Sequence, residues 1–344
     1  MAKQRIDADS GATAQRGARV IGLELLDALG KAHERYVAGE QGALHDVRVA
    51  VRRLRTWLRA YEPVLGDTVS KKSRRAVREL AEETAVARDA EVALEMFSEL
   101  PAPPPRTRTG HADLQRRLER ETARSRGEAD EALGERIPRV VKRLTRELSH
   151  YQLDVPVDGD RQIETMAAFS ADVVEKHGER LARALEQLDE QLEDAHGEPP
   201  DPDAMHDARI SAKRLRYIVE RVSPKSDAGA ALIERLTSLQ DTLGEFRDAR
   251  ALADRALAEI GRSARSDSRE RARALLSSAD VPADGLKPAR SRVRPGLMQV
   301  ARGADARAKE AWQRFAIGWP HSGGVEELRA DVAKVIDGLS SDAS

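Results

Sequence analysis

The sequence contains no cysteine, and this absence excludes disulfides, cysteine-ligated zinc, iron–sulfur clusters and a thiol nucleophile. Aromatic residues make up only 3% of the chain, so its core must consist mainly of Leu, Ala and Val, which favours helices. No stretch approaches the roughly 18 apolar residues of a membrane span, and the polar first residues lack the apolar core of a signal peptide. We therefore expect an unexported, cytoplasmic protein.

An excess of charge of one sign is also missing. The 58 Lys and Arg residues face 59 Asp and Glu residues, for a formal net charge of −1. This balance excludes a uniformly basic nucleic-acid-binding chain, so any basic site must be local. Arginine supplies 47 of the 58 basic residues, and its planar guanidinium group suits bidentate contacts to phosphate or carboxylate.

Sequence motifs of catalysis and metal binding are absent as well. The chain has no GxxxxGK[ST] loop, no GxGxxG fingerprint, no HExxH and no Cys/His metal spacing. It also lacks an alternating Glu run ending in Lys, of the sort that lines triphosphate-hydrolysing tunnels. The scarcity of aromatic residues argues against the stacking platform that single-stranded nucleic-acid binding normally uses. We therefore predict a protein that is not an enzyme, needs no metal or cofactor, and does not have nucleic acid as its partner.

Apolar residues recur at three-to-four spacing along most of the chain, which is typical of helices, and no segment alternates convincingly like a strand. The predicted helices cover 20–36, 43–65, 70–100, 111–126, 128–151, 161–195, 204–222 and 227–260, with one or two more within 297–338. Residues 262–295 are expected to form a loop that carries a short helix near 268–277. Short connections favour antiparallel helical bundles, so the predicted fold class is all-α.

One motif occurs twice. Residues 45–55 align without gaps on residues 206–216, at an offset of 161, and an Arg-Asp-Ala sequence recurs further on at an offset of 159. Duplication explains this joint recurrence best. We therefore predict two tandem pseudo-repeats, each an antiparallel helical bundle. The predicted organisation is a disordered tail at 1–17, a first repeat at 18–153, a linker at 154–160 and a second repeat at 161–340.

Each copy of the motif places its basic residues on one helix face. At about 100° per residue they fall within an arc of about 80°, while Val47, Val51, Leu54 and their counterparts lie opposite. The two stripes are His45, Arg48, Arg52, Arg55 and Arg59, and His206, Arg209, Lys213 and Arg216. A solvated face relieved by acidic partners is one interpretation. Because the stripes contain almost no acid and share a register, we favour a polyanion as the partner, held in a central basic groove.

Three further features are candidates for the same site. The segment 71–78 holds five basic residues and no acid, and helical spacing favours Lys71, Arg75 and Arg78 as contributors. The two motif histidines either cap or pack at a helix start or donate to a phosphate oxygen. Arg88 and Arg247, each followed by Asp, are either ion pairs that lock helices or further ligands.

These residues resemble the CHAD family, the conserved-histidine α-helical domain. The resemblance rests on the H-x-x-R-x-x-x-[RK]-R-L-R segments that begin at His45 and His206, with support from residues 88–92 and 239–248, and it spans about residues 18–260. It implies two helical-bundle repeats around a basic channel that binds inorganic polyphosphate and, in some members, association with polyphosphate or storage-polymer granules. The binding positions it implies are His45, Arg48, Arg52, Arg53, Arg55, His206, Arg209, Lys213, Arg214 and Arg216.

The sequence therefore predicts a module that binds inorganic polyphosphate through basic His, Arg and Lys stripes without catalysis. Two alternatives stay open. One is a polyphosphate or triphosphate hydrolase, and the other is a scaffold whose stripes dock acidic proteins or RNA.

Overall fold

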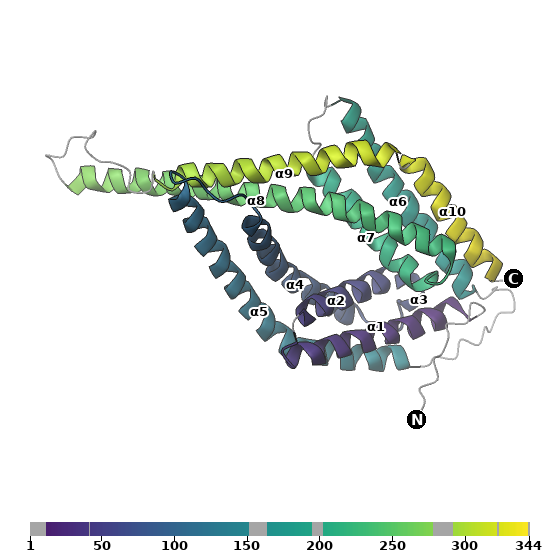
Figure 1. Ribbon diagram of the computed structural model, residues 1–344. Coiled ribbons are helices and arrows are strands. Elements are labelled where there is room, and N and C mark those ends of the chain that lie inside the picture. The colour runs from purple at the N-terminus through teal and green to yellow at the C-terminus, as the bar shows by residue number, and fades with distance from the viewer. Residues whose placement is uncertain are drawn as a thin grey trace. The chain divides into compact units, whose positions relative to one another are not determined.

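The computed structural model describes residues 12–40, 42–150, 164–194, 202–277, 292–321 and 323–342. Within these ranges the chain is helical and forms no strand, and a single isolated bridge joins Thr13 and Thr165 (Figure 1). The predicted all-α fold class is therefore confirmed. The helices are α1 (Ala14–Val37), α2 (Ala43–Ala60), α3 (Glu62–Leu65), α4 (Lys71–Ser98), α5 (Arg108–Ser149), α6 (Met166–Asp194), α7 (Pro202–Val222), α8 (Asp227–Ser277), α9 (Arg294–His321) and α10 (Gly324–Asp342).

The loop predicted at 262–267 is wrong, because α8 continues without a break to Ser277, whereas the predicted helix near 268–277 is present as the last part of α8. The buried face of this last part of α8 is polar: Ser263 and Asp267, four residues apart, are 5% and 4% exposed. Asp267 is ion-paired with Arg294 at the start of α9. The apolar periodicity that identifies helices is therefore missing here, although the helix itself is formed. Residues 278–291 of the predicted loop lie outside the described residues.

The tail predicted for residues 1–17 is also wrong at its end, because α1 begins at Ala14. Thr13 caps the helix, since its hydroxyl accepts a hydrogen bond from the backbone N–H of Arg16 at 3.3 Å. The backbone N–H of Ala14 donates to the carbonyl of Glu164 at 2.9 Å. The start of α1 is thereby tied to the chain that leads into α6. Residues 1–11 and the predicted linker at 154–160 lie outside the described residues, and the division into repeats at 18–153 and 161–340 stays a prediction.

The chain divides into two compact units, neither of which is continuous in sequence. Unit 1 comprises residues 1–85, 128–241 and 316–344, and unit 2 comprises residues 86–127 and 242–315. Both copies of the repeated motif belong to unit 1. None of the described helices is both long enough and apolar enough to span a membrane.

In unit 1, α2 is anchored to α1 and α6 by Trp57 near its end and by Tyr61, the residue that follows its last turn. The indole N–H of Trp57 donates to the carbonyl of Ala18 in α1 at 2.9 Å. The ring of Trp57 stacks on that of Tyr61 with centroids 3.8 Å apart, and the Tyr61 hydroxyl lies 2.8 Å from the hydroxyl of Ser170 in α6. Because buried aromatic pairs with satisfied polar atoms allow little rotation of a helix, these contacts set the direction in which α2 presents its opposite face.

A second close contact in unit 1 joins α6 to α10. A Cβ atom at Gly178 would lie 2.8 Å from a methyl carbon of Val332, so the absence of a side chain at this position lets the two helices approach. Gly178 adjoins His177, and the contact therefore also fixes the position of this part of α6.

Unit 2 is built around the parts of α8 and α9 that run side by side (Figure 1). The rings of Phe246 and Trp312 have centroids 6.5 Å apart, and the ring of Trp312 stacks on that of Phe315 at 5.4 Å. Arg250 of α8 forms an ion pair with Asp305 of α9 at 2.9 Å. Aromatic packing and cross-helix ion pairs thus hold this unit together.

Candidate functional site

The two copies of the repeated motif, separated by some 160 residues in the sequence, lie on neighbouring helices of unit 1. Arg53 of α2 forms an ion pair with Glu220 of α7 at 2.8 Å, and Arg216 of α7 approaches the same carboxylate at 3.7 Å. Both guanidinium groups also lie over the ring of Tyr217, at 5.7 and 5.2 Å from its centroid. Two of the predicted site residues, Arg53 and Arg216, thus help to join α2 to α7.

Six basic side chains of α2, α6 and α7 act on one another electrostatically, and we call them the basic cluster: Arg55, Arg59, Lys176, His177, Arg180 and Arg214. At its centre is Arg214, whose pKa is lowered from the ordinary value of a guanidinium to about 10. Burial is the main cause, followed by the positive charges of Arg59, Arg180 and Arg55, while Asp207 opposes them. Arg214 still carries its proton at neutral pH, so the cluster holds like charges close together in a partly desolvated place.

His177 is the one member of the basic cluster that loses its charge. Burial lowers its pKa to about 4, and the positive charges of Arg214, Arg180, Lys176 and Arg59 contribute to the shift. Its Nδ1 atom is buried and has no hydrogen-bond partner among the described residues. A neutral imidazole therefore sits among four cations at neutral pH.

Within the part of the chain that the structure describes, the cationic members of the basic cluster are not ion-paired. Arg55, Arg59, Lys176, Arg180 and Arg214 form no ion pair with any described residue, and the same holds for the adjacent Arg52. Elsewhere in unit 1, arginines on the helix surfaces are commonly paired, as Arg139 is with Glu135 at 3.1 Å. Described acidic residues act on the basic cluster only without ion pairing, Asp207 on Arg214 and Glu82 on Arg55, so its charge is compensated only in part.

The basic cluster extends toward α4 through Arg55. Burial lowers the pKa of Arg55; Glu82 opposes this shift, and Arg59, Arg78 and Arg52 add to it. A hollow of about 330 Å³ opens here between α2, α3 and α4, and Glu62 is the one acidic residue in its lining. The basic residues that line it are Arg55, Arg59, Lys71, Arg74, Arg75 and Arg78. The structure therefore brings the predicted Lys71, Arg75 and Arg78 next to the first stripe.

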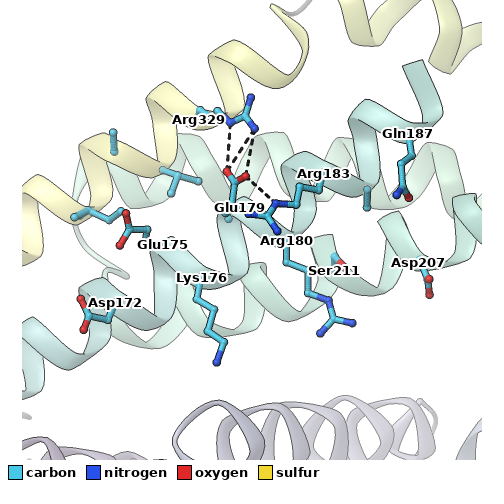
Figure 2. Close-up of a pocket in the computed structure, with 15 residues that line it drawn as sticks. Asp172, Glu175, Lys176, Glu179, Arg180, Arg183, Gln187, Asp207, Ser211 and Arg329 are labelled. Carbon is cyan, nitrogen blue, oxygen red and sulfur yellow. Dashed lines mark hydrogen bonds and ion pairs between the residues drawn. The ribbon is translucent and has the colours of Figure 1, made fainter. Parts of the chain in front are cut away.

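A second hollow, of about 870 Å³, lies between α6, α7 and α10 (Figure 2). On its α10 side, Glu179 accepts hydrogen bonds from Arg183 at 3.0 Å and from Arg329 at 3.4 Å. Lys176 and Arg180 also line the hollow, but Figure 2 shows that they extend to the side opposite Arg329. Members of the basic cluster thus line both hollows: Arg55 and Arg59 line the first, and Lys176 and Arg180 line the second.

The remaining predicted residues differ in accessibility. His45 and His206 are exposed near the starts of α2 and α7. Arg48 is enclosed by protein, with only 4% of its surface exposed, whereas Arg52, Arg209 and Lys213 are half-buried. Asp46, beside the first histidine, is ion-paired with Arg35 of α1 at 2.7 Å.

Arg88 and Arg247 belong to unit 2, whereas both basic stripes belong to unit 1. Arg88 lies 3.5 Å from Glu91 and 3.4 Å from Glu95. Arg247 lies 3.2 Å from Asp89 and 3.3 Å from Asp248. Of the two interpretations left open by the sequence, the contact between Arg247 of α8 and Asp89 of α4 favours an ion pair that locks helices, whereas the contacts of Arg88 lie within α4 itself.

Sequence reasoning missed the contribution of α6. Lys176, His177 and Arg180 join the basic cluster, although they lie outside the repeated motif. The pattern that could have identified them is a third H-x-x-R spacing, His177 to Arg180, which matches the first four residues of each motif copy. Arg74 was also missed; it lines the hollow of α4 and donates to the carbonyl of Leu65 at 3.0 Å.

No group of three or more acidic, His or Cys side chains able to hold a metal ion occurs among the described residues.

Comparison with known proteins identifies the family to which the chain belongs. A family model described as the CHAD domain matches residues 21–257. Among solved structures, the CHAD domain from the plant Ricinus communis is similar over 86% of this chain and 96% of its own, with 21% identity and a TM-score of 0.58. PptA from Streptomyces chartreusis is similar over 90% of this chain and 97% of its own, with 17% identity and a TM-score of 0.59. The search of curated proteins gives no match.

Proposed function

Because the chain belongs to the CHAD-domain family, we propose that it binds inorganic polyphosphate on the basic cluster of unit 1 and does not cleave it. The observation that carries this proposal is the convergence of basic side chains from α2, α6 and α7 that form no ion pair with any described residue. Polyphosphate is the ligand that the family resemblance implies. A linear polyanion with one negative charge on each internal phosphate matches a row of cations better than a compact anion does.

The electrostatics of the free protein explain why such a ligand would bind. Folding brings Arg214 close to Arg59, Arg180 and Arg55, and the lowered pKa of Arg214 measures the resulting repulsion together with the cost of burial. A phosphate chain along the basic cluster would replace repulsion by charge-assisted hydrogen bonds, each of which contributes roughly 1.5–3 kcal/mol. The free energy of repulsion is thus recovered on binding.

The two hollows offer the linear ligand a route. One end of the chain would lie in the hollow lined by Arg55, Arg59 and the basic residues of α4, and the other would run past Lys176 and Arg180 between α6 and α7. Arg59 and Arg214 would contact the middle of the chain. Long chains held in this way would also bring the protein to polyphosphate granules, and fluorescent tagging in cells would test that location.

The test is a calorimetric titration with polyphosphates of defined length at low salt. Arg59→Gln and Arg214→Gln should each weaken binding by about tenfold or more, the equivalent of one lost charge-assisted contact. Arg139→Gln is the matched control, because Arg139 is an exposed arginine of the same unit that already has a partner in Glu135. Equal effects of all three substitutions would show that net charge alone matters, and the proposed site would be wrong.

Two further measurements address the alternative functions. Incubation of the pure protein with polyphosphate and Mg²⁺ or Mn²⁺ should release no phosphate above the background, and release that depends on the protein would establish a hydrolase instead. In a competition experiment at equal phosphate concentration, polyphosphate should displace RNA. If RNA displaced polyphosphate, the scaffold interpretation would be correct.

A further inference from the structure

We propose that His177 is a proton-linked residue of this site: a polyanion that occupies the basic cluster draws a proton onto the imidazole, so that the complex carries one more positive charge than the free protein. The inference rests on the proposed function, since an anion must occupy the basic cluster. It adds a residue outside the repeated motif and makes proton uptake part of binding.

The geometry sets His177 among cations of three helices. Lys176 and Arg180 lie near it on α6, and the charges of Arg214 on α7 and Arg59 on α2 also act on it. These are the charges that act on it most strongly, and all of them are positive. Glu179, which directly precedes Arg180 on α6, accepts hydrogen bonds from Arg183 and Arg329 on the α10 side. From α10 itself, the contact next to His177 is apolar, between Val332 and Gly178.

The free protein keeps this imidazole neutral. Its pKa is lowered to about 4 by burial and by the four cations, and the buried Nδ1 has no hydrogen-bond partner among the described residues. A buried nitrogen without a partner destabilises a fold, and an apolar side chain could fill the same place. The imidazole of His177 can accept a proton at neutral pH only when the positive charge around it is offset.

A bound phosphate chain makes that change. Its negative charges offset those of Arg59, Lys176, Arg180 and Arg214, and this removes the part of the pKa shift that those cations cause. Direct contact with the ring is not required, because the effect acts through the electric field of the ligand. The pKa of His177 in the complex is therefore higher than in the free protein.

The sign of the pH dependence follows. Because the pKa of His177 is higher in the complex, binding takes up a proton at every pH between the free and the bound pKa values. Affinity then decreases as pH rises through that window, by at most about tenfold per pH unit for a single linked proton. The window opens near pH 4, the free pKa of His177, and closes at the bound pKa.

The decisive experiment follows the imidazole resonances of the uncleaved, full-length protein by NMR, with and without saturating polyphosphate, from pH 4 to 8. His177→Gln assigns the resonance and serves as the variant for calorimetry. His33→Gln is the matched control, because burial also lowers the pKa of His33 in the same unit, while the charge that acts on it is that of Glu34 and not a group of cations.

We expect the pKa of His177 to rise by one unit or more on binding, with the resonance of His33 unchanged. Calorimetry in buffers of different ionisation enthalpy should show proton uptake that His177→Gln removes and His33→Gln retains. The phosphate chain ends also titrate, but they contribute equally to the proton uptake of all three proteins. Their contribution therefore cancels when the variants are compared with the wild type. The NMR measurement uses the wild-type protein, so it remains decisive if the Gln variant folds poorly.

The two proposals fail in distinguishable ways. If polyphosphate binds and the pKa of His177 stays the same or falls, this inference is overturned and the proposed function stands. If polyphosphate does not bind in the titration at low salt, the proposed function fails, and this inference fails with it.

Discussion

The charge of Arg214 is predicted to destabilise the free protein, and Arg214→Gln should therefore increase stability while it weakens binding. The pKa of Arg214 is lowered from the ordinary value of a guanidinium to about 10, which corresponds to an upper limit of roughly 3 kcal/mol against the charged form. The side chain is half-buried and part of its field is screened by solvent, so we expect a gain of about 1–2 kcal/mol in the free energy of unfolding at low salt. The effect applies at every pH below about 10, where the guanidinium is protonated.

Urea unfolding followed by circular dichroism would measure this gain, with Arg139→Gln as the control. The difference between Arg214→Gln and the wild type should shrink at about 1 M NaCl, because salt screens the repulsion. Saturating polyphosphate should reverse the order, since the wild type then regains the contacts that the variant lacks. A loss of stability at low salt that high salt leaves unchanged would show that Arg214 acts through packing of its aliphatic stem, and the repulsion argument would be refuted.

Three other outcomes are expected. Polyphosphate affinity should fall with salt at a slope of about −4 on logarithmic axes, from about −0.7 for each of some six contacts; a slope near −1 in the titration would contradict a site of many contacts. Glu220→Gln should reduce the free energy of unfolding by about 1–3 kcal/mol, because it breaks the ion pair that Arg53 of α2 forms with Glu220 of α7. An unchanged urea midpoint would show that this ion pair has no structural role. Arg247→Gln should lower thermal stability while polyphosphate affinity stays within about twofold, since its charge is compensated by Asp89 and Asp248; a tenfold loss of affinity would make Arg247 a ligand.

The fold class and the orientation of α2 followed from the sequence because both depend on local periodicity. Val47, Val51 and Leu54 were predicted to lie opposite the basic stripe, and each is 0% exposed. The same reasoning failed for the last part of α8, where the buried positions are polar and Asp267 is satisfied by Arg294 of another helix. A helix whose buried positions are polar has no apolar period to recognise.

The repeated motif predicted where the basic residues lie on each helix, but not which of them stay without a partner. Arg53 and Arg52 are neighbours in the same motif, yet only Arg53 meets a carboxylate, because Glu220 comes from α7. Arg48 has the spacing of a surface residue and is nevertheless enclosed. These differences arise from the neighbours that packing supplies, and those neighbours are distant in the sequence.

The sequence by itself determined the helical class, the duplicated motif and the basic face of each motif helix, since all three are properties of residues a few positions apart. Only the tertiary structure decided that α2 and α7 meet, that α6 adds His177 and Arg180 to them, and that the pKa of Arg214 is lowered. The physical reason is that helix periodicity extends over a few turns, whereas electrostatic repulsion and burial depend on which distant segments the packing of unit 1 brings within a few ångströms of one another.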